Sequence, residues 1–184
     1  VVMSLKTSQQ SLFSRAKKCN PFWVFHKTST GNIYPLEVGY AEARTSNVSY
    51  DKEVAVGACK TGCALFGKGG GCPPLAPDFE KLRDKFPYGQ VVYSRLFTRY
   101  YPPKVAEGSF YIRWNFVKAL MERKIASVGY YLRDSLDGFF LSAGPCHGCG
   151  NQTCAFKDGE EMCRKPEKRV FSLESTGVLA DRLV

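Results

Sequence analysis

Cysteine spacing is the feature that most constrains the fold of this 184-residue chain. Seven of its eight cysteines lie in two tight groups with the spacings C-x3-C-x8-C-P-P and C-x2-C-x4-C-x8-C. The first group is Cys59, Cys63 and Cys72, and the second is Cys146, Cys149, Cys154 and Cys163. A chain of this length buries a core without covalent cross-links, so the cysteines are not needed as staples. We therefore predict that both groups bind metal.

Disulfide bonds are the competing use of so many cysteines. The N-terminal sequence VVMSLKTSQQSLF has neither the apolar core nor the cleavage site of a secretory signal. No apolar run approaches the roughly 20 residues that cross a bilayer. The chain is therefore expected to be cytoplasmic, where cysteines stay reduced, and to make no membrane contact.

The second group contains enough thiols to close one four-coordinate site. Four thiolates suit either tetrahedral zinc or an iron-sulfur cluster. Zinc fingers and ribbons pair two short knuckles across a long gap, whereas the ligands after Cys149 are strung out singly. This spacing indicates that the chain wraps around something larger than one ion. We predict a [4Fe-4S] cluster here, with zinc as the alternative.

The first group offers only three thiols. Pro73 directly after Cys72 resembles the cysteine-proline pair of bacterial ferredoxin motifs. The glycine-rich stretch 67–71 leaves backbone amides free to approach cluster sulfides, and Lys68 within it is predicted to contact the cofactor. The C-x3-C-x2-C spacing of radical-SAM enzymes is absent. We predict a second [4Fe-4S] cluster that lacks one cysteine ligand.

Three residues beside these cysteines are further candidates. Arg164 follows Cys163 directly and is predicted to neutralise the charge of a cluster. His147 lies inside the second group and is a candidate ligand or hydrogen-bond donor to one. Cys19 stands alone and is expected to be a small buried side chain, with a role as an eighth ligand as the alternative.

The chain is basic, with 26 Lys plus Arg against 17 Asp plus Glu and a formal net charge of +9. Such a surplus is typical of proteins that bind nucleic acid. The basic residues are scattered along the sequence, however, and bound thiolate clusters would offset part of the charge. Nucleic-acid binding is therefore not the expected function.

Hydrophobic periodicity predicts one small sheet with helices packed on it, in the α/β or α+β class, and two cysteine-rich cluster-binding loops. We predict strands at 33–43, 53–56, 91–101 and 139–142, and helices at 78–86, 109–128 and 166–176. The apolar stripe of the second helix is predicted to face the core, and Gly177 is predicted to cap the third helix. Because both cysteine groups follow predicted strands, they are expected to lie together.

The expected organisation is an N-terminal arm at 1–30 and a cluster-binding domain at 31–184. Within that domain, residues 143–165 are predicted to form a loop-rich region around the second cysteine group. The apolar stretch 22–25 of the arm is expected to pack onto the domain.

From about residue 33 onward, the chain resembles a family of small proteins of anaerobic archaea and bacteria that is described only as predicted metal-binding. The motifs that carry the resemblance are Cys59-x3-Cys63-x8-Cys72-Pro73-Pro74, Ala143-Gly144-Pro145-Cys146-x2-Cys149-x4-Cys154, Cys163-Arg164-x-Pro166-Glu167 and Ser172-x-Glu174-x-x-Gly177. The resemblance implies iron-sulfur binding by the seven grouped cysteines and a cytoplasmic, anaerobic setting. It implies no established reaction. Phe171 departs from the family pattern, which tends to have proline there.

These observations lead to one main hypothesis of function and two alternatives. The main hypothesis is an electron-transfer protein or redox subunit with two [4Fe-4S] clusters and a redox partner protein. The first alternative is an enzyme of the lyase or desulfidase type, in which the three-cysteine cluster presents an open iron to a small-molecule substrate. The second is a zinc-stabilised binding module. The sequence alone leaves open whether the protein is an enzyme.

Overall fold

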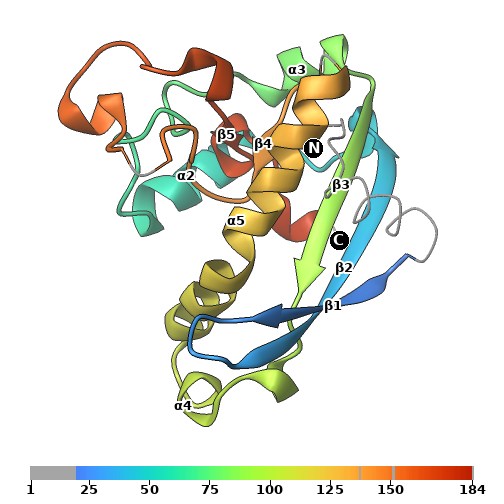
Figure 1. The fold of residues 1–184 in the computed structure, drawn as a ribbon. Helices are drawn as coiled ribbons and strands as arrows, with labels where there is room; N and C mark the ends of the chain where they lie inside the picture. Colours follow the sequence, from blue (N-terminus) through green and yellow to red (C-terminus); the bar gives the residue numbers. More distant parts are fainter. Residues whose placement is uncertain (1–19, 137, 151, 184) are drawn as a thin grey trace.

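A three-stranded antiparallel sheet is the largest β-structure of the protein (Figure 1). The structure is a computed structural model that describes residues 20–136, 138–150 and 152–183. The sheet has the order β1-β2-β3, and a separate pair of two-residue strands, β4 and β5, runs parallel. The strands are β1 (Phe22–Lys27), β2 (Ile33–Arg44), β3 (Tyr88–Arg95), β4 (Leu141–Ser142) and β5 (Phe171–Ser172).

Helices fill most of the connections between these strands. The α-helices are α2 (Lys52–Gly62), α3 (Phe79–Lys85), α4 (Pro103–Ala106) and α5 (Phe110–Leu136). Single 3-10 turns are η1 (Thr45–Asn47), η2 (Thr98–Tyr100), η3 (Ala155–Asp158), η4 (Pro166–Lys168), η5 (Glu174–Thr176) and η6 (Ala180–Arg182). Helices combined with an antiparallel sheet confirm the predicted class in its α+β form. Within the described ranges, no helix has the length and apolarity that crossing a membrane requires.

The long helix α5 lies beside the sheet and supplies much of the core. Leu120 and Met121 of α5 pack with Leu36 of β2, and Val128 packs near Tyr40 of β2. Figure 1 shows the sheet on one side of α5, and α2 with the segments after β4 on the other. The helix therefore stands between the sheet and the part of the molecule that carries the cysteines.

The predicted apolar stripe of α5 is only partly core. Met121 and Val128 are buried as predicted, but Phe110 is 74% exposed and Trp114 is 47% exposed. These two aromatic residues lie in the first turns of the helix. Periodicity alone does not show which turns of a helix are covered by a neighbouring element. The helix also runs on past Val128 to Leu136.

The predicted strand at 53–56 is wrong, because this segment forms the first half of α2. The side chain of Asp51 caps the helix and accepts a hydrogen bond from the Val54 backbone amide at 3.0 Å. Alternation over four residues is too short to outweigh this cap. The expectation that both cysteine groups follow strands is therefore wrong for the first group, which begins on a helix.

The predicted helix at 166–176 is also wrong. The segment is divided into η4, β5 and η5. Phe171 pairs with Leu141 in the parallel strand pair, and its ring stacks on Phe139 with centroids 5.8 Å apart. This tertiary pairing replaces the helical hydrogen bonds, but Gly177 does cap η5 with a φ of 98°.

The other predicted elements are confirmed with shifted ends. β2 covers the predicted 33–43, and β3 begins at Tyr88 and ends at Arg95. α3 is capped by Asp78, whose carboxylate accepts a hydrogen bond from the Glu80 amide at 3.0 Å. The predicted stretch 22–25 forms most of β1, while residues 1–19 of the predicted arm lie outside the described residues.

Gly129 is predicted to be essential for the packing of α5 against the segment that leads into β4. A Cβ at this position would lie 2.0 Å from the Phe140 ring, which is 6% exposed and has no room to move. We expect Gly129→Ala to lower the free energy of unfolding by about 1–3 kcal/mol through overpacking. Gly57→Ala in α2 is the control, because a Cβ there meets nothing within 4 Å. Urea denaturation under anaerobic conditions should show the first variant destabilised and the second equal to or above the wild type.

Candidate metal centre

The first cysteine group is built on the end of α2 and the loop that follows it. Cys59 lies in the last turn of the helix, and Cys63 caps it by donating its backbone N–H to the Cys59 carbonyl at 3.1 Å. Cys72 follows a glycine-rich loop and is 8% exposed. The Cys59 thiol interacts electrostatically with both other thiols, so the three side chains share one site.

The glycine-rich loop passes close to the Cys72 thiol, while the approach of its amides to cluster sulfides stays a prediction. Gly67 has a φ of 69°, which an L side chain rarely adopts, and a Cβ at Gly69 would lie 3.2 Å from the Cys72 sulfur. Lys68 is exposed on this loop and donates its backbone N–H to the Leu65 carbonyl at 3.0 Å. The contact between Lys68 and a cofactor stays a prediction.

The second cysteine group follows β4 in a run of tight turns. The Cys149 thiol interacts electrostatically with those of Cys154, Cys163 and Cys146. All four residues are half-buried. The Cys146 sulfur accepts two backbone hydrogen bonds, from Gly148 at 3.4 Å and from Val170 at 3.3 Å. The backbone therefore holds the Cys146 sulfur in a fixed position.

The two groups touch each other, as the sequence predicted. A Cβ at Gly71 would lie 2.4 Å from the Val170 carbonyl oxygen and 3.2 Å from the Cys146 Cβ. The Gly71 carbonyl accepts a hydrogen bond from Ser172 at 3.2 Å. The Cys72 thiol also interacts electrostatically with that of Cys154. The first group's loop and the second group's turns therefore form one continuous site.

Arg169 joins the two loops in a way that sequence reasoning did not assign. Its guanidinium donates hydrogen bonds to the Gly70 carbonyl at 2.6 Å and the Leu75 carbonyl at 3.4 Å. The same group lies 5.1 Å from the Phe156 ring centroid and 4.7 Å from that of Phe171. These hydrogen bonds join residues 99 and 94 positions apart, so no local sequence signal marks them.

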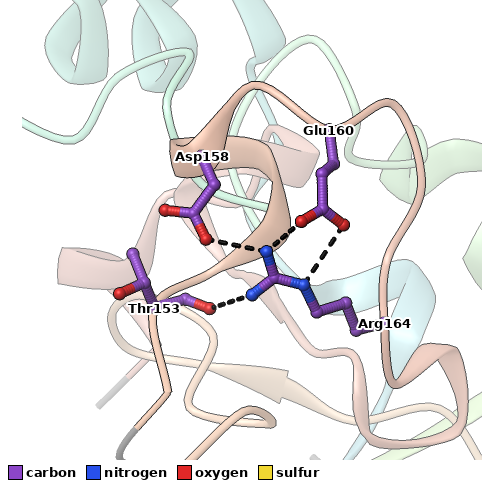
Figure 2. Close-up of polar contacts among 4 residues, drawn as sticks. All are labelled: Thr153, Asp158, Glu160 and Arg164. Carbon is purple, nitrogen blue, oxygen red and sulfur yellow. Dashed lines mark hydrogen bonds and ion pairs between the residues drawn. The ribbon is translucent and has the colours of Figure 1, made fainter.

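Arg164 directly follows Cys163 and contacts Thr153, Asp158 and Glu160 of the preceding loop (Figure 2). Its guanidinium donates to Asp158 at 2.8 Å, to the Thr153 carbonyl at 3.1 Å and to both carboxylate oxygens of Glu160. These contacts hold the loop between Thr153 and Arg164 together. The predicted contact of Arg164 with a cluster stays a prediction, since its described partners are acidic side chains and a backbone carbonyl.

One face of α5 borders the second cysteine group. Lys118, Glu122 and Tyr130 recur on this face at multiples of four residues. The Glu122 carboxylate lies 2.7 Å from His147 Nε2 and 3.7 Å from Lys118 Nζ. Both Lys118 and Glu122 lie against Gly144. His147 thus has a carboxylate partner that fixes its ring, as a residue beside a metal ligand commonly does.

Tyr130 was also missed, because it lies beyond residue 128, where the predicted helix ended. Its hydroxyl is buried and interacts with the Cys146 thiol and the His147 backbone. Burial, followed by Cys146, raises the pKa of Tyr130 well above its ordinary value. The hydroxyl therefore stays protonated and is a potential donor to the Cys146 sulfur.

The buried thiols resist ionisation in the metal-free protein. Burial, followed by Glu174, Cys63 and Cys72, raises the pKa of Cys59 to about 11. Burial also raises the pKa of Cys72 and that of Cys149, and neighbouring thiols add to both shifts. Thiols that raise each other's pKa become thiolates together only when a cation compensates their charge. This donor set fits a thiolate-bound metal cofactor.

The seven grouped cysteines are free thiols, and Cys19 lies outside the described residues. Within the part of the chain that the structure describes, no three His, Cys, Asp or Glu side chains converge closely enough to hold a single metal ion.

A sequence profile of the family described as predicted metal-binding protein (DUF2284) matches residues 42–184. The chain belongs to this family. The match covers both cysteine groups and confirms the resemblance drawn from their motifs. No curated protein and no solved structure matches the chain. The family places this protein among predicted metal-binding proteins without naming the metal.

Gly71 is predicted to control the contact between the two cysteine groups. Because the obstructing atom is the Val170 backbone oxygen, Gly71→Ala forces the loops apart. We expect a loss of about 1–3 kcal/mol in the free energy of unfolding and a lower metal content. The control is Gly62→Ala, which adds a Cβ between Cys59 and Cys63 where nothing lies within 4 Å. Equal metal content in both variants would contradict the role given to Gly71.

Thiol reactivity in the metal-free protein should follow exposure and pKa. At pH 8, a thiol with a pKa of about 11 is thiolate in only about one molecule in a thousand, so Cys59 should react slowly with iodoacetamide. Cys63 is exposed and should react first, and buried Cys72 should react slowly. Mass spectrometry after short alkylation of chelator-treated protein measures the order. In urea the three rates should converge; the same spread in urea would contradict this explanation.

Proposed function

We propose that the protein binds two [4Fe-4S] clusters and transfers electrons, alone or as a redox subunit. The observation that supports this most is the division of seven thiols into two sets that touch across Gly71. Iron-sulfur clusters are held by cysteine thiolates, and their irons and sulfides keep the ligating sulfurs farther apart than a single ion does. Seven thiols in two neighbouring sets supply enough cysteine ligands for two such clusters, with one ligand missing from the first.

Each set has a distinct role in the proposal. Cys146, Cys149, Cys154 and Cys163 would hold one cluster with four thiolates, and Cys59, Cys63 and Cys72 would hold the other with three. When bound, the clusters supply one-electron transfer. The chain holds the two sets against each other and aims the Gly148 and Val170 amides at the Cys146 sulfur. Hydrogen bonds to cluster sulfurs help to set the reduction potential.

The proposal includes a redox partner protein and a cytoplasmic, anaerobic setting. The first set lies closest to the surface at Cys63, which is exposed at the end of α2. Lys60 and Lys68 are exposed near it in the sequence, and the chain is basic as a whole. A partner with an acidic surface would be attracted to this region and brought near the exposed end of the first set.

A second candidate function is an enzyme with an open iron. It is favoured by the thiol count of the first set, because three cysteines leave one iron of a four-iron cluster without a thiolate. An iron that is not fully ligated acts as a Lewis acid toward a small-molecule substrate, as in lyase or desulfidase chemistry. A zinc-stabilised module is the third reading, and metal analysis separates it from the first two.

Metal analysis of single-cysteine variants tests the proposal. Anaerobically purified wild-type protein should be brown and contain about eight irons and eight sulfides per chain. Cys72→Ser and Cys149→Ser should each lose one cluster and keep about four irons, because the variants remove ligands from different sets. Iron, acid-labile sulfide and zinc are measured on the same samples.

The control is Cys19→Ser, which leaves both grouped sets complete. Its iron content should equal that of the wild type. A colourless wild-type protein with stoichiometric zinc would contradict the electron-transfer proposal and its open-iron alternative together. Reduced-state EPR spectra that change when small thiols or cyanide are added would favour the open-iron enzyme over electron transfer.

A further inference from the structure

A cavity of about 280 Å³ lies between the sheet, α3 and the segment around β4. The end of β2 and the start of β3 form one wall, and α3 with residues 138–141 forms another. Most of the lining side chains are apolar, among them Phe79, Leu82, Phe139, Leu141 and Leu173. The same five residues belong to, or pack against, one hydrophobic cluster of the core. The cavity is therefore a hollow within the apolar interior.

The size of this cavity indicates a binding site and not a packing gap. Protein interiors are close-packed and contain few voids larger than a water molecule. An apolar cavity of about 150 Å³ is enough to bind benzene, so one of about 280 Å³ has room for an apolar group of roughly eight to ten carbon atoms. Small-molecule sites are typically lined in this way, by apolar side chains with a few polar groups that orient the ligand.

The cavity reaches the surface at Tyr88, which lines it and is 70% exposed. A second hollow of about 200 Å³ adjoins this opening, because Thr45, Arg83 and Tyr88 line both hollows. The second hollow is mostly polar, and its further lining residues are Arg44, Ser46, Asp84 and Pro87. The apolar cavity thus has a polar and charged mouth.

Two guanidinium groups at this mouth can bind an anion. Arg44 is exposed and has no ion-pair partner among the residues that the structure describes. Arg83 donates one hydrogen bond to Glu80 at 3.0 Å, and an arginine has five N–H donors. Asp84 is the acidic side chain of the mouth, so two guanidinium groups stand against one carboxylate there. Guanidinium groups bind carboxylates through two parallel hydrogen bonds, which favours a carboxylate as the anion.

We propose that this cavity binds a carboxylic acid with an apolar chain of roughly eight carbon atoms. The chain lies among the apolar side chains of α3 and β4, and the carboxylate binds Arg44 and Arg83 at the mouth. This inference does not rest on the proposed electron transfer, because no grouped cysteine lines either hollow.

The experiment measures the binding of probe molecules to the anaerobically purified full chain by isothermal titration calorimetry. Octanoate has the chain and the carboxylate, 1-octanol has the chain without the charge, and acetate has the charge without the chain. We expect octanoate to bind saturably and acetate not to bind. Octanol should bind about tenfold more weakly than octanoate, because it makes no charge-assisted hydrogen bonds to the arginines.

Two variants separate the cavity from its mouth. Arg44→Gln combined with Arg83→Gln removes both positive charges, which should weaken octanoate binding about tenfold and leave octanol binding unchanged. Ala43→Leu adds a larger side chain to the cavity lining, and the residue paired with Ala43 across the strands is Gly89, which has no side chain to clash. Ala43→Leu should abolish the binding of octanoate and octanol alike.

Arg99→Gln is the matched control for the loss of an arginine. Arg99 is exposed and belongs to η2, which follows the opposite end of β3. This variant should bind octanoate as the wild type does. Circular dichroism checks that each variant folds, and Ala43→Val replaces Ala43→Leu if the larger side chain prevents folding.

A wild-type protein without saturable octanoate binding would overturn the inference. Octanoate binding that is unchanged in the double arginine variant, or in the variant at Ala43, would overturn it too. Octanol that binds as tightly as octanoate would show an apolar hollow with no preference for a carboxylate, which also contradicts the proposal. Iron and sulfide analysis of the same samples tests the proposed function separately, so the failure of one proposal leaves the other standing.

Discussion

The contact between the Gly70–Gly71 backbone and the segment at Arg169–Val170 is the constraint on which the candidate site depends. Gly71 lies so close to the Val170 carbonyl oxygen that a Cβ at position 71 does not fit. The Arg169 guanidinium also donates a hydrogen bond to the Gly70 carbonyl. The same segment places the Val170 amide on the Cys146 sulfur. One short stretch of backbone therefore fixes the first cysteine loop, the second cysteine group and the distance between them.

Helix α5 connects this contact to the rest of the fold. Its core face meets Leu36 and Tyr40 of the sheet, whereas the face with Glu122 and Tyr130 meets His147 and Cys146. Because one face of α5 packs on the sheet and another on the candidate metal centre, the helix fixes the position of the thiols relative to the sheet. A thiol set that must stay closely spaced in the absence of metal requires such support, because no cation then holds the thiols together.

The sequence predicted what depends on local chemistry and missed what depends on tertiary pairing. The cysteine groups and the Gly177 turn follow from residue type and spacing, and the structure confirms the turn. β5 could not be predicted, since Phe171 adopts a strand only because β4 lies beside it. The packing of η5 against α2 likewise depends on tertiary contacts, which no spacing within either segment encodes.

The two cysteine sets are unequal before any metal is bound. The second set offers four thiols, whereas the first offers three. The second set also has two amide contacts on Cys146, whereas the first has an exposed Cys63. Ligand number, exposure and hydrogen bonding are among the factors that set cluster potentials. Two clusters held by these sets would therefore differ in potential, and electrons would have a preferred direction between them.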